Sequence, residues 1–317
     1  MYKIYSFYDL YPEPEAYLRE RAELTLARGL DKADAAARLA EAHGAVLSGQ
    51  RVDAALLERA PLLRAVANIA VGYDNYDLNA MRARGVVGTI TPDVLSDEVA
   101  DLALALMLSA CRRVAELDRG MRAGTWPSGE AASFGMSMTG KTLGIIGMGR
   151  IGQRAAHKAH FGFGMDILYH NRTARPEAES AYGAKLVTLN ELLSNSDFVL
   201  MLAPLTPSTR AMMGREQFAK MKPTAFFINV SRGGCVDEPA LIDALRSGVI
   251  RGAGLDVFAN EPIEKDNPLL FLGNVTLTPH VGSATRATRN AMQMLAARSL
   301  LDVLDGRPCA TVVPELR

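Results

Sequence analysis

The feature that most constrains the fold is a glycine-rich turn between a predicted strand and a predicted helix. Residues 143–152 read LGIIGMGRIG, an apolar run that leads into the pattern G-x-G-x-x-G. In this pattern Gly147 permits a tight turn, Gly149 lets the backbone approach a pyrophosphate, and Gly152 lets the helix pack closely on the sheet. Such a turn alone is weak evidence, but a second predicted strand follows at 166–169. Together they predict a dinucleotide site at a helix N-terminus.

Short apolar runs alternate with amphipathic segments along the whole chain, which is typical of β-α units with parallel sheets. The glycine pattern is absent from the first set of these units and occurs only in the second, which begins at Thr142. We therefore predict two doubly wound, Rossmann-like α/β domains with an interdomain cleft: a substrate-binding domain (1–98 plus 284–317) and a dinucleotide-binding domain (99–283). The predicted strands are 4–7, 45–47, 65–69, 86–90, 143–146, 166–169, 198–202, 225–230, 254–257 and 275–277.

The predicted helices include two that bear on assembly. Residues 97–124 read as one long helix, rich in Ala and Leu and apolar on more than one face. Such a helix is expected to be buried between domains or subunits, which favours a homodimer. Residues 286–304 form a last helix, predicted to return to the first domain. The others are predicted at 15–27, 53–60 and 79–84.

Composition excludes several classes of function. The 317 residues include 35 basic and 35 acidic side chains, a balance that argues against nucleic acid or an anionic membrane surface as partner. No apolar run is long enough to span a membrane, and the N-terminus lacks a leader pattern. The three cysteines form no C-x-x-C pair, so we expect reduced thiols and a cytoplasmic protein.

Three segments that follow predicted strands carry side chains suited to catalysis. Arg232 follows one strand, Asp256 and Glu261 the next, and His280 a third. Arginine can bind a carboxylate through two charge-assisted bonds, and histidine is the natural acid or base near neutral pH. Taken singly, each is more often a surface or structural residue. Strands of one parallel sheet end at a common edge, so together they predict one site.

Other candidate residues rank lower. His157 and His160 stand three residues apart on the helix after the glycine pattern. No carboxylate or cysteine lies at a metal-ligand spacing from them, so we predict packing or surface roles and no metal site. His170 ends a predicted strand and is a candidate for the edge of the adenine pocket. Cys235 has no neighbour in sequence that would activate it, and is interpreted as inert.

With these segments in hand, the chain resembles the D-isomer-specific 2-hydroxyacid dehydrogenases over nearly its whole length. The resemblance is carried by VGYDN at 71–75, DEVAD at 97–101, the glycine pattern, PLTP at 204–207 and the three strand-end segments. Within the family, HFGFGM at 160–165 and EQFAKM at 216–221 look most like the bacterial glyoxylate/hydroxypyruvate and 2-ketogluconate reductases.

The resemblance implies reduction of a small 2-oxo acid to a D-2-hydroxy acid. Arg232 would bind the substrate carboxylate and polarise the keto oxygen, and His280 would donate a proton to that oxygen. Glu261 would hydrogen-bond the other imidazole nitrogen and stabilise the imidazolium. Backbone N–H groups of Val71 and Gly72 would also bind the carboxylate. Glyoxylate, hydroxypyruvate and 2-ketogluconate all stay open as substrates.

The resemblance also implies a set of cofactor contacts, with Asp256 binding the nicotinamide carboxamide. The full set is Gly147, Gly149, Arg150, Ile151, Gly152, Asn171, Arg172, Thr173, Pro204, Thr209, Val230, Arg232, Asp256, His280 and Gly282. The chain departs from the NAD pattern after the second strand of this domain, where an acidic residue would bind the ribose. Neutral Asn171 and cationic Arg172 stand there instead, so NADP(H) is expected to be preferred, with NAD(H) possible.

An alternative of another class is a dinucleotide-sensing binding protein on the same fold, as in corepressors that resemble these dehydrogenases. Such corepressors usually carry extended tails, whereas this chain ends soon after its last predicted helix. A phosphoglycerate dehydrogenase with a regulatory domain would need more chain. A formate dehydrogenase would lack Glu261 as the partner of the histidine.

Overall fold

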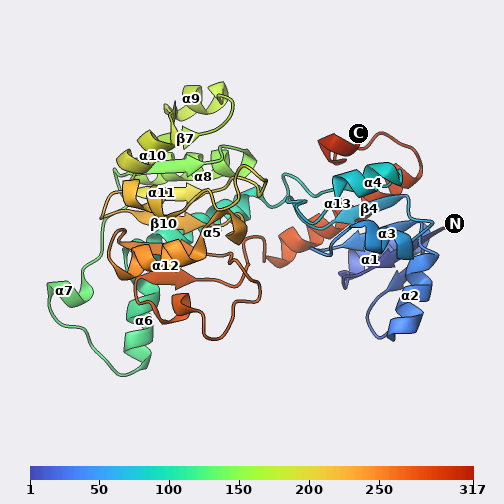
Figure 1. Ribbon diagram of the computed structural model, residues 1–317, viewed down its shortest axis with the longest axis horizontal. Helices are drawn as coiled ribbons and strands as arrows, with labels where there is room; N and C mark the ends of the chain where they lie inside the picture. Colours follow the sequence, from blue (N-terminus) through green and yellow to red (C-terminus); the bar gives the residue numbers. More distant parts are fainter. The chain divides into compact units, whose positions relative to one another are not determined.

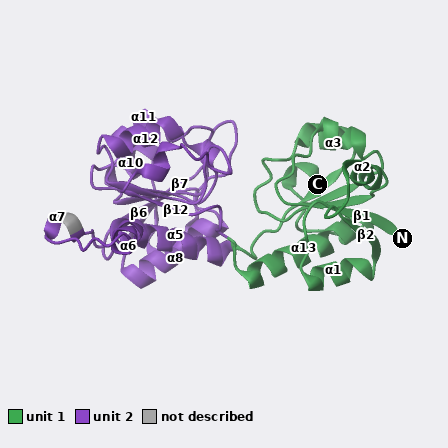
Figure 2. Ribbon diagram, turned by 90° about the horizontal axis from the view of Figure 1, so that it is seen from below, with its two compact units in different colours: residues 1–95, 283–317 green, residues 96–282 purple. Residues whose placement is uncertain are grey.

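The computed structural model describes residues 1–317, apart from the side chains of residues 131 and 132. The chain forms two compact units, drawn in different colours in Figure 2. Unit 1 comprises Met1–Leu95 and Ser283–Arg317, and unit 2 comprises Ser96–Gly282. Each unit is built around its own parallel sheet. The predicted architecture of two parallel α/β domains is therefore confirmed.

Unit 1 has a five-stranded sheet in the order β2-β1-β3-β4-β5 (Figure 1). Its strands are β1 (Tyr2–Ser6), β2 (Ala22–Leu26), β3 (Gly44–Leu47), β4 (Ala65–Asn68) and β5 (Val87–Thr89). Its helices are α1 (Pro12–Arg19), α2 (Lys32–Ala40), α3 (Ala54–Arg59), α4 (Leu78–Ala83) and α13 (Arg286–Leu304). As predicted, α13 returns to this unit and packs on β3 and β4.

Unit 2 has a seven-stranded sheet in the order β12-β11-β10-β9-β6-β7-β8. Its strands are β6 (Thr142–Ile146), β7 (Asp166–His170), β8 (Lys185–Leu186), β9 (Phe198–Met201), β10 (Phe226–Asn229), β11 (Gly252–Leu255) and β12 (Val275–Leu277). From β6 the chain builds outward through β7 and β8, and then restarts on the other side of β6 with β9. This reversal is where ligands bind in open α/β sheets.

The helices of unit 2 cover both faces of this sheet (Figure 1). They are α5 (Ser96–Cys111), α6 (Val114–Arg122), α7 (Glu130–Ser133), α8 (Arg150–Phe163), α9 (Pro176–Tyr182), α10 (Leu189–Asn195), α11 (Arg215–Lys220) and α12 (Glu238–Arg246). Every residue of β9, β10 and β11 is buried, as expected for parallel strands between two helical layers.

Side-chain caps fix where many of the helices begin. Asp53 and Asp77 accept backbone N–H groups of the first turns of α3 and α4. Asp237 and Thr285 do the same for α12 and α13, and Thr188 forms a capping box at α10. A cap of this kind satisfies N–H groups that have no partner within the helix and stabilises it by about 1 kcal/mol.

The predicted helix at 15–27 is wrong in its second half. The helix α1 ends at Arg19, and residues 22–26 form β2, which pairs with β1 at the edge of the sheet. In β2 the side chains of Ala22 and Leu24 are buried while that of Glu23 is exposed. This alternation has the two-residue period of a half-buried strand and outweighs the helical propensity of the segment.

The predicted single helix at 97–124 is also wrong, because it is broken near its middle. Arg113 adopts a left-handed backbone conformation with φ of 58° between α5 and α6. Its guanidinium binds the carboxylate of Glu116 through contacts of 2.7 and 2.8 Å. The helix α5 is largely buried against α8, β10 and β11, whereas α6 has no buried residue. Only the first half is thus buried, and the elements that bury it belong to unit 2 itself; burial between domains or subunits stays a prediction.

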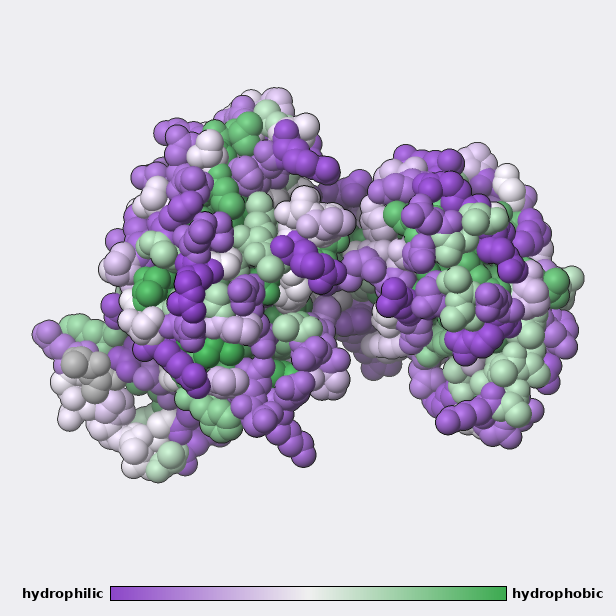
Figure 3. All heavy atoms as spheres, viewed as in Figure 1, coloured by the Kyte–Doolittle hydropathy of each residue, from purple (hydrophilic) through white to green (hydrophobic). Residues whose placement is uncertain are grey.

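On the face drawn in Figure 3, hydrophobic residues form small patches among hydrophilic ones. None of the helices in the described part of the chain has the length and apolar character needed to span a membrane.

Candidate active site

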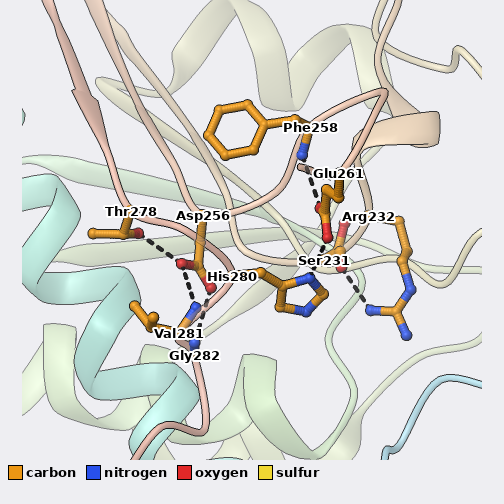
Figure 4. A network of polar contacts seen from close by, with 9 residues as sticks. All are labelled: Ser231, Arg232, Asp256, Phe258, Glu261, Thr278, His280, Val281 and Gly282. Carbon is orange, nitrogen blue, oxygen red and sulfur yellow. Dashed lines mark hydrogen bonds and ion pairs between the residues drawn. The ribbon is translucent and has the colours of Figure 1, made fainter. Parts of the chain in front are cut away.

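The candidate site is built from three loops that follow adjacent strands of unit 2. Arg232 follows β10, Asp256 and Glu261 follow β11, and His280 follows β12. The three strands are parallel neighbours, so their carboxyl ends lie at one edge of the sheet. Figure 4 shows the four side chains gathered there. The geometry brings together the residues that the sequence singled out.

Glu261 and His280 form the central contact. The Nδ1 atom of His280 lies 2.6 Å from Oε2 of Glu261, and the backbone N–H of Phe258 donates to Oε1 at 3.0 Å. Burial alone would raise the pKa of Glu261. The hydrogen bonds from His280 and Phe258, with the charges of His280 and Arg232, outweigh burial and lower this pKa below its usual value. An ionised carboxylate can only accept, so Nδ1 is the protonated nitrogen in this contact.

The Arg232 loop is fixed by a residue that sequence reasoning missed. Asn229 is 1% exposed, and its Nδ2 donates to the carbonyl of Arg232 at 3.1 Å. Its Oδ1 accepts from both the N–H and the hydroxyl of Ser231, each at 3.0 Å. The guanidinium of Arg232 donates to the carbonyl of Ser231 at 2.8 Å. An asparagine at a strand end is a turn signal, but nothing in the sequence indicates these partners.

Gly233 holds this loop against the loop of Glu261. A Cβ atom at position 233 would lie 1.9 Å from the carbonyl oxygen of Phe258, so only glycine permits this approach. The backbone after Arg232 therefore lies directly against the backbone that donates to Glu261. This contact couples the placement of the two charged side chains.

Asp256 is buried, with 1% of its surface exposed. Its carboxylate accepts hydrogen bonds from the hydroxyl of Thr278 and from the N–H groups of Val281 and Gly282. The sequence did not indicate Thr278. The predicted contact of Asp256 with a nicotinamide carboxamide stays a prediction.

The glycine loop lies where the sheet of unit 2 reverses its order, between β6 and α8. Gly147 has φ of +103°, and a Cβ there would lie 2.6 Å from the backbone nitrogen of Ala203. A Cβ on Gly152 would lie 2.7 Å from the carbonyl oxygen of Gly147. Gly149, by contrast, has no atom within 4 Å of where its Cβ would lie. A tight turn with open space at its middle glycine, at the start of a 14-residue helix, fits a pyrophosphate.

The residues after β7 differ in their partners and exposure, and their predicted contacts with the cofactor stay a prediction. The side chain of Asn171 turns to the glycine loop, where it accepts from the N–H of Met148 at 2.7 Å and donates to its carbonyl at 3.3 Å. Arg175, which sequence reasoning missed, donates to the same carbonyl at 3.0 Å. Arg172 and Thr173 are exposed. Asn171 thus shapes the loop through its side chain, and Arg172 is the exposed cation beside it.

The other predicted contact residues are spread over both units. In unit 2, Arg150 is exposed at the start of α8, Ile151 is half-buried, and Val230 and Gly282 are buried. The hydroxyl of Thr209 donates to the carbonyl of Pro204 at 2.5 Å.

Val71 and Gly72 follow β4 in unit 1 and are half-buried. The carbonyl of Gly72 accepts from the side chain of Asn68 at 2.9 Å, and this asparagine is 1% exposed. The buried amide therefore holds the loop that contains Val71 and Gly72.

The histidines of α8 are engaged in packing. The ring centroid of His157 lies 4.7 Å from the ring centroid of Phe161. The ring centroid of His160 lies 4.9 Å from the same centroid of Phe161. His160 also contacts the carbonyl of Met165 through Nδ1 at 3.0 Å. In the part of the chain that the structure describes, no group of three or more His, Cys, Asp or Glu residues is arranged to hold a metal ion. Cys235 is buried.

Comparison with known proteins places the chain in a family. Residues 104–282 match the NAD binding domain of the D-isomer specific 2-hydroxyacid dehydrogenases. The chain is 50% identical over 273 residues to glyoxylate/hydroxypyruvate reductase B of Shigella boydii serotype 4 (strain Sb227). The aligned residues make up 86% of this chain and 84% of that protein.

Solved structures agree with this placement. The NADPH-dependent glyoxylate/hydroxypyruvate reductase of Sinorhizobium meliloti, in complex with NADP and malonate, has a TM-score of 0.86 and 35% identity over 99% of this chain and 97% of that one. A Thermus thermophilus protein, TT0316, has a TM-score of 0.89 and 41% identity over 98% and 99% of the two chains. The chain therefore belongs to the D-isomer specific 2-hydroxyacid dehydrogenases and is an oxidoreductase that uses a nicotinamide dinucleotide.

Proposed function

We propose that the protein is an NADPH-dependent reductase of small 2-oxo acids, with glyoxylate and hydroxypyruvate as its substrates. The observation that carries this proposal is the contact between His280 and Glu261 at the sheet edge that also presents Arg232. The identity to glyoxylate/hydroxypyruvate reductase B supports the choice of substrate. The extension to 2-ketogluconate stays a prediction.

Arg232 is the proposed binding group for the substrate. Its planar guanidinium can bind the carboxylate and the keto oxygen together, and the loop beneath it is fixed by Asn229 and Gly233. Positive charge beside the keto oxygen stabilises the negative charge that develops there during reduction. The predicted contribution of the Val71 and Gly72 N–H groups stays a prediction.

His280 is the proposed proton donor. A bound nicotinamide supplies the hydride that reduces the keto carbon. His280 contacts Glu261 through Nδ1, which leaves Nε2 as the nitrogen that donates a proton to the keto oxygen. The carboxylate of Glu261 stabilises the protonated imidazole and fixes the orientation of the ring.

The residues of the glycine loop fit the phosphates of a dinucleotide, since the loop is open at Gly149 and leads into α8. The preference for NADPH rests on Arg172. This arginine is exposed and follows Asn171 in the chain, directly after β7. In a dehydrogenase specific for NAD, the segment directly after this strand would carry a carboxylate.

The direct test of the function is steady-state kinetics with glyoxylate, hydroxypyruvate and 2-ketogluconate, each with NADPH and with NADH. We expect turnover of glyoxylate and hydroxypyruvate, with higher kcat/KM for NADPH. A protein that binds NADPH but turns over none of the three acids would instead support a dinucleotide sensor.

Replacing Glu261 with glutamine should shift the pH dependence of reduction. In the wild type, the lowered pKa of Glu261 keeps the carboxylate ionised to lower pH than usual, and it stabilises the imidazolium. Glutamine removes that charge. As pH rises, the rate should therefore be lost at lower pH than in the wild type. The measurement is kcat from pH 5 to 9.

The matched control is Glu264→Gln, which removes an exposed carboxylate three residues away that bonds to Asn260. Its pH profile should coincide with that of the wild type. If the Glu261→Gln profile coincides as well, the carboxylate does not support the proton donor.

Replacing Arg172 with alanine should weaken the use of NADPH alone. Charge-assisted bonds from a guanidinium to a 2′-phosphate are worth about 1.5–3 kcal/mol, or roughly ten- to a hundredfold in kcat/KM. NADH lacks that phosphate, so its kcat/KM should change little. Arg154→Ala, which removes another exposed arginine of the same unit, is the control. An equal loss with both cofactors would mean that Arg172 does not recognise the phosphate.

The predicted homodimer stays a prediction. It is supported by large hydrophobic side chains that are exposed on and after α6. Val114 is 55% exposed, Met121 49%, Trp126 80% and Phe134 61%. Figure 1 shows α6 and the segment that follows it extending from the body of unit 2.

A further inference from the structure

One buried residue, Asp256, binds the loop that carries His280 on both sides of the histidine. Its backbone carbonyl accepts from the N–H of His280 at 2.9 Å. Its Oδ1 atom accepts from the hydroxyl of Thr278 at 2.6 Å and from the N–H of Val281 at 2.8 Å. Its Oδ2 atom accepts from the N–H of Gly282 at 2.9 Å. Four hydrogen bonds from residues 278–282 thus end on Asp256. Figure 4 shows the three that its carboxylate accepts.

The backbone of His280 has an uncommon conformation that this arrangement explains. Its φ is +51°, in the left-handed region that residues other than glycine adopt rarely. Such a conformation persists where the surrounding structure over-determines it, and it is found often at functional sites. Here Thr278, two residues before His280, and Val281, directly after it, are both hydrogen-bonded to Asp256. The left-handed turn directs the imidazole to Glu261.

Thr278 has a specific part in this arrangement, because its hydroxyl orients the carboxylate of Asp256. The short bond from Thr278 holds Oδ1 in the position that also accepts from Val281, which places Oδ2 toward Gly282. A Cβ on Gly282 would lie 3.3 Å from Oδ2 and 3.3 Å from Cγ2 of Val99 in α5. Gly282 thus lies close to both the carboxylate of Asp256 and α5.

We propose that Thr278 and Asp256 are positioning residues for the proton donor. They hold His280 in its left-handed conformation, which keeps Nδ1 on Glu261 and so fixes where Nε2 lies. The inference rests on the proposed function of His280. It gives Asp256 a role that is separate from any contact with the nicotinamide, and it assigns to Thr278 a role in turnover.

The test compares Thr278→Val with Thr278→Ser in the full-length protein. Valine keeps the shape of threonine but has no hydroxyl, whereas serine keeps the hydroxyl. We expect kcat for glyoxylate reduction with NADPH to fall about tenfold in Thr278→Val, the effect of losing a hydrogen bond to a charged group. In Thr278→Ser it should stay within about twofold of the wild type, as expected where the hydrogen bond is kept. The Kd of NADPH, from the fluorescence of the bound cofactor, should be unchanged in both.

The split between kcat and Kd separates positioning from cofactor binding and from general damage to the fold. A Thr278→Val protein with wild-type kcat overturns the proposal, and so does one in which Kd rises in proportion to the loss of kcat. If Thr278→Val does not fold, Thr278→Ala is measured in the same way. Wild-type kcat, or a Kd that rises in proportion to the loss of kcat, would then overturn the proposal in that variant.

A crystal structure of Thr278→Val gives a readout that does not depend on activity. We expect residue 280 to leave the left-handed region, or its ring to leave Glu261. An unchanged loop would overturn the proposal. Failure of the proposed function looks different, because the wild-type protein would then turn over no 2-oxo acid, or His280→Ala would keep its activity.

Discussion

Replacement of His280 by alanine is expected to lower kcat for the reduction of glyoxylate by about 10²–10⁴, the usual contribution of a positioned general acid. The alanine variant keeps Arg232 and the glycine loop, so the substrate and NADPH should still bind. The loss should therefore fall on kcat, with the Kd of NADPH little changed. Steady-state kinetics and a fluorescence titration with NADPH measure the two quantities.

The matched control is His157→Ala, which removes an exposed histidine of α8 that packs against Phe161. It should leave kcat near the wild-type value. A His280→Ala enzyme with wild-type kcat on its best substrate would exclude His280 as the proton donor, and with it the mechanism proposed for the sheet edge.

The place of the site was predictable from the sequence for a simple geometric reason. Arg232, Asp256, Glu261 and His280 each follow a short apolar run, and parallel strands of one sheet end at a common edge. The glycine pattern likewise identified the strand and helix that flank the glycine loop. In both cases a short segment of sequence carries the pattern, and the parallel sheet places these segments at a common edge.

What the sequence did not reveal are the contacts between these loops. The left-handed φ of His280, the hydroxyl of Thr278 on Asp256 and the amide of Asn229 on the Arg232 loop all depend on how separate segments meet. A single threonine or asparagine in a loop has many uses, so its residue type gives little information about its partner.

The errors in secondary structure have a related cause. Residues 22–26 form a strand because they pair with β1, a partner twenty residues away in sequence. Their own propensities are compatible with a helix, and tertiary context overrides such preferences. The break at Arg113 is similar, since a left-handed arginine has no sequence signature and is accompanied here by the contact with Glu116.

The second large effect is expected at Arg232. Replacement by lysine should lower kcat/KM for glyoxylate nearly as much as replacement by alanine, although lysine keeps the positive charge. The ammonium group lacks the planar fork that binds the carboxylate and keto oxygen together. It also cannot reproduce the contact of the guanidinium with the carbonyl of Ser231 while it binds the substrate. A charge-assisted hydrogen bond contributes about 1.5–3 kcal/mol, so we expect a loss of roughly 10- to 100-fold from each bond that is not replaced.

This experiment separates shape from charge at the substrate site. Because the pKa of Glu261 is lowered in part by the charge of Arg232, lysine should preserve that effect, and the pH profile should stay close to that of the wild type. Alanine should lose both the fork and the charge. Arg246→Lys, at an exposed position in the last turn of α12, controls for a general effect of the substitution. A lysine variant with wild-type kcat/KM would show that a point charge suffices at position 232, and that the substrate is not bound through two parallel hydrogen bonds.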